Sequence, residues 1–186
     1  MDLTKSFRDV FNWRNVDKSR KDSPEDCRRD MTMNEKYLLL LMDELRSQNK
    51  TFTGAVKLVK AIFMAQSQAE TKSAKTNFKY NFYRWDYGPF DSAIYRDIEK
   101  LFKKGLLRVS THYTPYPEKT FSLTEDGERE ATKIKSQVDQ TFLSAIEHWA
   151  NKINEMNRDA VLKLVYEKSK VKDYEMGDKI ALPHVD

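Results

Sequence analysis

FKYNFYRWDYGPFDSAIYRDIEKLFKKGLLRVSTHYTPYPEKTFSLTEDG, residues 78–127, is the stretch that decides the fold of this chain. At its start, Phe78, Tyr80 and Phe82 alternate with polar residues, and an alternation of period two is typical of a strand with one buried face. The dipeptide Gly88-Pro89 then interrupts the pattern, because proline has no amide proton to donate to a ladder. The stretch therefore begins with a predicted strand that ends in a turn.

A helix and a hairpin are expected after this turn. Asp91 is a good N-cap for a helix that runs to Lys104, and Gly105 suits the left-handed residue that ends it. Residues 106–113 and 119–123 read as a β-hairpin, and we expect the two prolines between them to keep its tip out of the ladder. Strand, turn, helix and hairpin in this order are typical of a winged helix, in which a recognition helix and a wing contact nucleic acid.

The polar face of this helix and the hairpin carry the candidate nucleic-acid contacts. Arg96 is the best candidate for a base contact, because a guanidinium can form two hydrogen bonds to guanine, while lysines would contact phosphates. Asp97 would repel phosphate and Glu99 could pair with a lysine, so an ordinary solvated amphipathic helix is the alternative. The candidate DNA-binding residues are Ser92, Arg96, Lys100, Lys103, Arg108 and Lys119.

The positive charge of the chain is concentrated in its middle. The net charge is +4 over 186 residues. Residues 57–120 hold 12 Lys and Arg against 6 Asp and Glu, whereas residues 1–56 hold 11 against 10 and residues 121–186 hold 10 against 13. A basic middle beside an acidic end is expected of a nucleic-acid binder, and chance clustering of solvated faces is the alternative.

Two helices are expected ahead of residue 78. Thr32 and Glu35 form a capping box that starts the first one. The second covers residues 53–68, and its apolar spacing places Lys57 and Lys60 outward.

Two aromatic residues precede the Gly-Pro turn. Trp85 and Tyr87 could stack on bases, but an aromatic residue ahead of Gly-Pro more often packs under the turn, so we expect both in the core. Gly88 is expected to supply a backbone conformation that other residues resist.

After the hairpin, the sequence predicts one long helix from Thr124 and a second one at residues 159–168. We expect an apolar stripe on the long helix to pair two copies of the chain, since winged-helix proteins that read two half-sites need twofold symmetry. The alternative is that this stripe covers the chain's own first two helices. The expected dimer-interface residues are Ile134, Val138, Phe142, Ala145 and Trp149.

The sequence offers no assembled catalytic or cofactor site. Its single cysteine, Cys27, excludes an intrachain disulfide, and its 5 glycines are scattered singly, without a phosphate-binding loop. His112, His148 and His184 lack the spacing of metal ligands. We therefore expect no enzyme activity, no cofactor and no metal. No membrane-spanning segment or signal peptide is visible, so we expect a cytoplasmic protein.

These observations predict a mainly α protein with a small β-hairpin, namely a winged helix-turn-helix followed by C-terminal helices. Residues 1–30 are expected to form an N-terminal arm, residues 31–127 the winged-helix domain and residues 128–186 a C-terminal helical module.

One set of motifs resembles bacterial regulators. Tyr87-Gly88-Pro89-Phe90, the helix that follows, and Phe121-Ser122-Leu123-Thr124 with Gly127 resemble the helix-to-wing signature of PadR- and MarR-type winged-helix proteins. Phe121 stands where those families usually carry Tyr. The resemblance implies a dimeric repressor that binds double-stranded DNA.

A second likeness spans residues 57–95. Lys57-Leu58-x-Lys60, Ala65-Gln66 and Trp85-x-Tyr87-Gly88-Pro89, with Tyr95, are similar to the YwgA-type winged-helix family and to the SocA-like Panacea domain of antitoxins and proteolytic adaptors. The Panacea resemblance implies a protein that binds and neutralises a toxin. We thus expect a transcriptional regulator that binds duplex DNA as a dimer, with an antitoxin- or adaptor-like protein-interaction module as the alternative.

Overall fold

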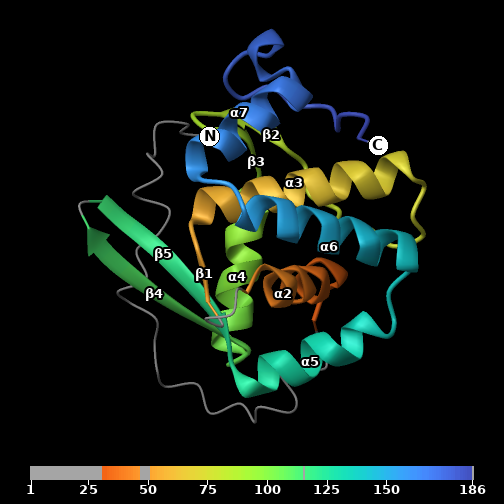
Figure 1. Ribbon diagram of the computed structural model, residues 1–186, viewed down its shortest axis with the longest axis vertical. Helices are drawn as coiled ribbons and strands as arrows, with labels where there is room; N and C mark the ends of the chain where they lie inside the picture. The colour runs from red at the N-terminus through yellow and green to blue at the C-terminus, as the bar shows by residue number, and fades with distance from the viewer. Residues whose placement is uncertain (1–30, 47–50, 115, 186) are drawn as a thin grey trace.

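The computed structural model describes residues 31–46, 51–114 and 116–185, and these are mainly helical with small antiparallel sheets (Figure 1). The arm expected at residues 1–30 lies outside the described residues. No described helix is both long and apolar enough to cross a membrane. The elements in chain order are α2 (Met33–Leu45), β1 (Phe52–Thr53), α3 (Ala55–Thr71), β2 (Tyr83–Trp85), β3 (Gly88–Phe90), α4 (Ala93–Lys103), β4 (Leu107–Thr114), β5 (Tyr116–Leu123), α5 (Glu125–Lys135), α6 (Gln140–Asn154), α7 (Arg158–Ser169) and the 3₁₀ helix η2 (Val171–Asp173).

Helix α2 lies among the other helices (Figure 1). It carries four consecutive leucines, 38–41, and each is 0% exposed. A helix that is apolar on all sides has to be covered on all sides, and α4, α5 and α6 pack against it. Thr32 caps its first turn as predicted, because Thr32 Oγ1 accepts a hydrogen bond from the amide of Glu35 at 3.2 Å.

Helix α3 is also buried along most of its length. Residues 58–69 are buried without a break, since α6, α7 and β3 all pack against this helix. The prediction that Lys60 points outward is therefore wrong: the residue is 2% exposed. The apolar spacing of α3 could not reveal that the short strand β3 covers the face that carries this lysine.

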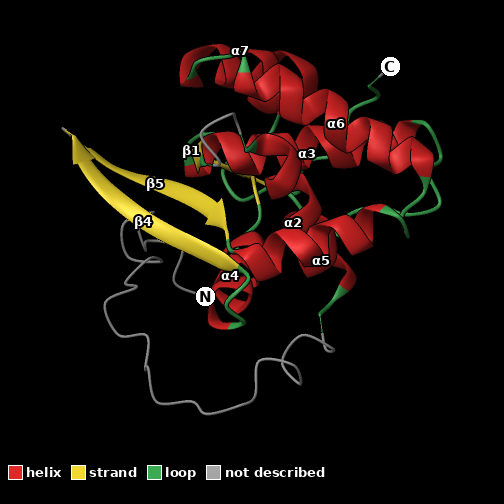
Figure 2. Ribbon diagram, turned by 60° about the horizontal axis from the view of Figure 1, so that its bottom comes forward, coloured by secondary structure: helices red, strands yellow, loops and turns green. Residues whose placement is uncertain are grey.

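The hairpin β4–β5 confirms the predicted β-hairpin and extends beyond the helices (Figure 2). Its register runs from Leu107 opposite Leu123 to Thr114 opposite Tyr116, and β1 pairs with the other edge of β5. The strand order is β1-β5-β4. The short strand β1 was not predicted, because its two residues carry no readable pattern.

The prolines exclude less of the hairpin tip from pairing than we expected, because Pro117 pairs with Tyr113 within the ladder. The amide of Gly54 donates to the carbonyl oxygen of Lys119 at 2.9 Å, so the backbone N–H and C=O groups of Lys119 point toward β1. Backbone groups alternate along an antiparallel strand, so Pro117 also turns its backbone away from β4. Its missing amide proton therefore costs the hairpin no hydrogen bond.

The segment at residues 78–85 confirms the predicted alternation but forms little strand. Phe78, Tyr80 and Phe82 are buried while Lys79, Asn81 and Tyr83 are exposed, yet pairing with β3 begins only at Tyr83. On the other side of β2, Tyr83 bridges Lys179 in the C-terminal tail. A tail that supplies its own strand contacts was not visible in the sequence.

The single long helix predicted from Thr124 is instead two helices. α5 ends at Lys135, and Asp139 in the break accepts a hydrogen bond from the amide of Lys75 at 3.1 Å. The break lets α5 pack on α2 while α6 packs on both α2 and α3.

The predicted dimer stripe is consequently part of the chain's own core. Ile134, Phe142, Ala145 and Trp149 are at most 3% exposed, and Val138 is half-buried against the same core. Side chains buried within one chain have no surface left for a second copy, so this stripe is not a dimer interface. It covers α2 and α3, which was the alternative that the sequence left open. The oligomeric state itself stays a prediction.

Candidate functional site

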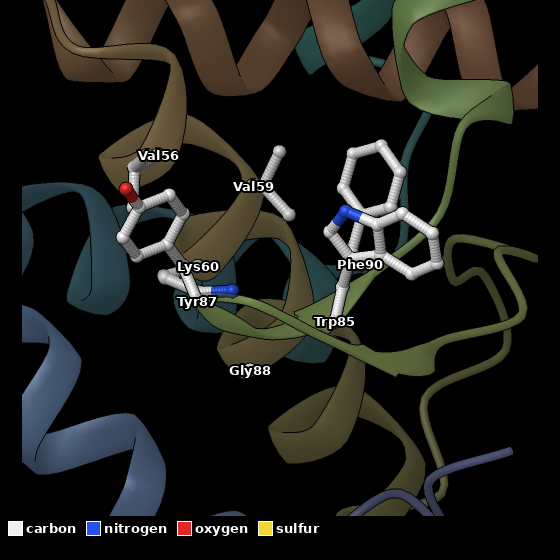
Figure 3. A pocket seen from close by; sticks show the side chains of 7 residues that line it. All are labelled: Val56, Val59, Lys60, Trp85, Tyr87, Gly88 and Phe90. Carbon is white, nitrogen blue, oxygen red and sulfur yellow. The ribbon is translucent and has the colours of Figure 1, made fainter. Parts of the chain in front are cut away.

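A buried lysine lies beneath the Gly88-Pro89 turn. Lys60 Nζ donates a hydrogen bond to the carbonyl oxygen of Pro89 at 2.6 Å. Burial disfavours the charged ammonium and lowers the pKa of Lys60 to about 7. A cavity of about 10 Å³, room for about one water, lies beside it (Figure 3). The cavity is lined by Val56, Val59, Lys60, Trp85, Tyr87, Gly88 and Phe90.

The turn above this cavity requires glycine for two reasons. Gly88 has φ +80°, and a Cβ there would lie 2.8 Å from Cε1 of Tyr166 on α7. The expected unusual backbone conformation of Gly88 is thus confirmed. Tyr166 also donates its hydroxyl proton to the carbonyl oxygen of Asp86 at 3.2 Å. The turn is therefore held between α3 and α7.

Trp85 and Tyr87 are not in the core, contrary to the prediction. Tyr87 is 37% exposed and Trp85 is half-buried, and Figure 3 shows the two rings on opposite sides of the cavity with Phe90 beside Trp85. The strands β2 and β3 have three residues each, too few to bury both rings. Tyr83, which is 42% exposed, shares a strand face with Trp85. We call Tyr83, Trp85, Tyr87 and Phe90 the aromatic corner.

Gln66 on α3 fixes the segment ahead of the corner. Its Nε2 donates to the carbonyl oxygen of Tyr80 at 3.0 Å, and its Oε1 accepts from the amide of Tyr80 at 3.2 Å. The side-chain amide thus takes the place of a neighbouring strand for Tyr80. The backbone oxygen of Gln66 accepts from Asn77 Nδ2 at 3.1 Å. These hydrogen bonds explain how Phe78, Tyr80 and Phe82 stay buried without a neighbouring strand.

The lysines expected to contact DNA are paired with carboxylates. Lys100 Nζ lies 3.2 Å from Glu35 Oε1 and 3.1 Å from Asp97 Oδ1, and the hydrogen bond to Asp97 is the main cause of a raised pKa for Lys100. Lys103 Nζ lies 2.6 Å from Glu99 Oε1. The charge of both lysines is therefore offset within the chain.

The arginine and serine of α4 are differently placed. Ser92 and Arg96 are exposed on one face of the helix, where Arg96 Nη1 contacts Ser92 Oγ at 3.4 Å. Among the described residues, no carboxylate forms an ion pair with Arg96. Arg96 thus presents its positive charge to solvent.

The two cations of the hairpin lie on opposite faces of it. Arg108 is exposed, whereas Lys119 is half-buried and donates to Thr111 Oγ1 at 2.8 Å. Burial lowers the pKa of Lys119. Lys119 lies opposite Thr111 in the register, so these two side chains share a face of the hairpin. Side chains alternate between faces along a strand, so Arg108, three residues from Thr111, lies on the other face. They do not form one cationic surface.

The histidines do not assemble a metal centre. In the part of the chain that the structure describes, no three His, Cys, Asp or Glu side chains are grouped as metal ligands would be. His112 Nε2 lies 3.3 Å from Ser110 Oγ on the exposed face of β4. His148 packs edge-on against Trp149, and burial, followed by Lys152 and Lys72, lowers the pKa of His148.

Comparison with known protein families places these contacts in context. A family model described as antitoxin SocA-like, Panacea domain, matches residues 58–170, from α3 to the end of α7. The chain belongs to this family. No curated protein and no solved structure matches it. The Panacea match contains the contact of Lys60 with Pro89, that of Gln66 with Tyr80 and that of Gly88 with Tyr166.

Elements outside the Panacea match complete its structure. α2 and β1 precede residue 58, while η2 and the tail follow residue 170. Arg84 Nη1, inside the match, donates to the carbonyl oxygens of Val171 at 2.7 Å and Tyr174 at 3.1 Å, both outside it.

Sequence reasoning from periodicity missed the roles of Lys60, Gln66 and Tyr166. The signal for the first two was the motif likeness to Panacea proteins, which placed Lys60 and Ala65-Gln66 at fixed distances ahead of the turn. No sequence signal linked Tyr166 to Gly88, because the two residues meet only through the folding of α7 onto β3.

Proposed function

We propose that this chain is an antitoxin-like protein that binds a toxic partner protein in the cytoplasm and neutralises it. The observation that carries the proposal is the Panacea family match over residues 58–170, whose description is that of an antitoxin. The proposal assigns the chain a binding role and no chemical reaction.

The charges on α4 support a protein partner over DNA. A lysine that already pairs with a carboxylate gains less from a phosphate, because the carboxylate repels it and the pair has to be broken. Lys100 and Lys103 are both in this position. The nucleic-acid interpretation needed these two lysines to be available.

The aromatic corner supports a protein-binding surface. Tyr and Trp are enriched at protein interfaces, since they bury a large area at a small cost in conformational entropy. Tyr83 and Tyr87 are among the exposed large apolar residues of the described chain. Arg158 on α7 lies 4.7 Å from the ring centroid of Tyr87 and extends this surface with a charge. A partner docking here would contact β2, β3 and α7.

Co-expression tests the proposal. Each protein encoded next to this chain is expressed alone and with it, and the expected result is one growth-inhibiting protein whose inhibition is relieved and which co-elutes stoichiometrically. Tyr87→Ala is expected to weaken this complex by about tenfold, the cost of one interface contact, while Tyr87→Phe keeps the ring and the affinity. Arg96→Ala and Lys100→Ala should bind normally. A chain that relieves no toxicity and captures no neighbour would contradict the proposal.

A second candidate is a winged-helix DNA-binding protein. The order α2, β1, α3, α4, β4, β5 with strand order β1-β5-β4 favours it, since a winged helix has this order of elements; β2 and β3 are inserted between α3 and α4. In this reading, residues 31–127 form the winged-helix domain and residues 128–186 an added helical module. A dimer would contact duplex DNA through Ser92, Arg96, Lys100, Lys103, Arg108 and Lys119.

An electrophoretic shift with random duplex DNA over a salt series tests this second candidate. Binding should weaken steeply with salt and on Arg96→Ala, and Lys103→Ala should flatten the salt slope by about one unit. Absence of a shift at low salt would rule this function out.

A further inference from the structure

Strand β4 forms the outer edge of the three-stranded sheet. In the strand order β1-β5-β4, β4 has a neighbour on one side among the described residues. Because Lys119 turns its backbone to β1, Glu118, Thr120 and Ser122 turn theirs to β4. Their partners in the register are His112, Ser110 and Arg108, which therefore form the hydrogen-bonded pairs.

The residues between these pairs present their backbone to the open edge. Leu107, Val109, Thr111 and Tyr113 each direct an amide proton and a carbonyl oxygen away from β5. Within the described residues, no backbone hydrogen bond reaches any of these groups. A row of such groups is a template for an added strand.

Apart from the exposed charge of Arg108, features that usually protect an edge strand are missing from β4. Natural edges carry proline, lysine or a bulge, but β4 reads LRVSTHYT and pairs with β5 without a bulge over 8 residues. The edge of β2 contrasts with it, because the chain's own tail fills that edge. Arg84 donates its amide proton to Asp178 at 2.7 Å, and Ile180 donates its own to Phe82 at 2.8 Å.

We propose that the edge of β4 binds an extended segment of the partner protein, which adds to the sheet as a further strand. The inference rests on the proposed function and names a second contact surface for the partner, in addition to the aromatic corner. Main-chain hydrogen bonds to Val109 and Thr111 would supply the affinity, as in other cases of strand addition.

The side chains of β4 define the chemistry of this segment. Arg108 and His112 would face the new strand in non-hydrogen-bonded pairs, in which side chains come closest. Arg108 is exposed, and within the described residues it has no ion pair, so an acidic residue opposite it gains a partner. Val109 and Thr111, on the other face, are half-buried and suit apolar neighbours. The segment that fits alternates acidic and apolar residues.

The test uses the full chain and a defined peptide, acetyl-Glu-Val-Glu-Val-Glu-Val-Glu-amide, followed by amide hydrogen exchange in NMR. The peptide is expected to slow the exchange of the Val109 and Thr111 amides by about tenfold. The amides of Ser110 and His112, already bonded to β5, should not change. The same peptide with Lys in place of Glu should bind more weakly because of Arg108.

A matched pair of variants isolates the edge hydrogen bond. Thr111→Pro removes an amide proton that makes no bond within the hairpin and is expected to abolish the protection. Thr111→Val loses the same contact with Lys119 Nζ but keeps the amide proton, so it should respond like the parent chain. The exchange experiment on the parent chain stands by itself if Thr111→Pro does not fold.

Three results would overturn the proposal. The first is no slowing at millimolar peptide, and the second is equal binding by Thr111→Pro. The third is that the Val109 and Thr111 amides exchange as slowly as that of Ser110 before any peptide is added, which would mean that the chain itself or a second copy already covers the edge. Failure of the proposed function shows separately, as a lack of toxin relief by the parent chain whatever the peptide does.

Discussion

Lys60 and Pro89 are joined by a hydrogen bond of 2.6 Å that ties the N-terminal half of α3 to strand β3. Both residues lie inside the Panacea match. The donor is a lysine amino group with 2% exposure, so when it is protonated the contact carries the cost of burying a charge as well as the gain of a hydrogen bond. This balance makes the stability of the protein depend on the protonation of one lysine.

Stability should rise with pH above neutrality because of Lys60. The unfolded side chain has the ordinary pKa of 10.5 and the folded one a pKa of about 7, so between these values the unfolded state binds a proton that the folded state has lost. Raising the pH therefore favours folding, by about 1.4 kcal/mol per unit. This contribution is complete above pH 10.5 and is lost as the pH falls to about 7.

Urea unfolding at pH 7.5 and pH 9 measures this effect against Lys60→Met, which fills the same space without a titrating group. The difference in unfolding free energy, parent minus variant, should increase by about 2 kcal/mol between the two pH values. Parallel pH profiles would contradict a depressed pKa for Lys60.

Gly88→Ala should destabilise the protein more than Gly105→Ala. Both glycines have positive φ, +80° and +70°, so alanine strains the backbone at each, by about 1 kcal/mol. A Cβ at Gly88 also meets Tyr166 at 2.8 Å, whereas one at Gly105 meets nothing within 4 Å. The additional overpacking should cost about 1–3 kcal/mol, measured by chemical denaturation. Equal losses would show that Tyr166 moves aside freely.

Glu35→Gln should cost about 3 kcal/mol of unfolding free energy. The carboxylate is 1% exposed and lies 2.6 Å from Lys104 Nζ, whose side chain is 10% exposed, so the substitution removes a negative charge that stabilises a buried ammonium group. Glu99→Gln is the matched control. It breaks the exposed pair with Lys103 and should cost less than about 0.5 kcal/mol. Similar values for the two variants would argue against a buried ion pair at Glu35.

Phe142→Ala should lower the unfolding free energy by about 3–5 kcal/mol, because it empties a core position that is 0% exposed. Val138→Ala, at a half-buried position, should cost about 1 kcal/mol. Thermal unfolding of the parent chain and of both variants at several protein concentrations completes the test. A midpoint that rises with concentration in the parent and not in Phe142→Ala would restore the dimer interpretation of this stripe.

Local signals in the sequence were reliable where they described one element. The cap at Thr32, the alternation from Phe78 to Phe82 and the left-handed Gly105 all depend on neighbours within a few residues, and each is confirmed. Only one of the two hydrogen bonds of the predicted capping box forms, the one from the amide of Glu35 to Thr32 Oγ1. Glu35 does not return to the amide of Thr32 because Lys100 and Lys104, about 65 residues away, take its carboxylate.

The predictions were wrong where a face of a helix is covered by a segment far away in the sequence. Lys60 has the spacing of an outward residue, and only the position of β3 buries it. The stripe on α5 and α6 has the spacing of a helix seam, but α2 and α3 take it up. Periodicity shows which side of an element is apolar, and it cannot show which other segment lies against that side.

The position of α2 and of the C-terminal tail bears on how this family's domain should be cut for expression. A fragment limited to residues 58–170 would lose helix α2, whose buried leucines fill the centre of the fold. It would also lose the carbonyl groups that accept hydrogen bonds from the guanidinium of Arg84. In such a fragment, the apolar side chains of α4, α5 and α6 that pack on α2 would be exposed to solvent. A fragment that begins before Thr32 and extends beyond Tyr174 retains both.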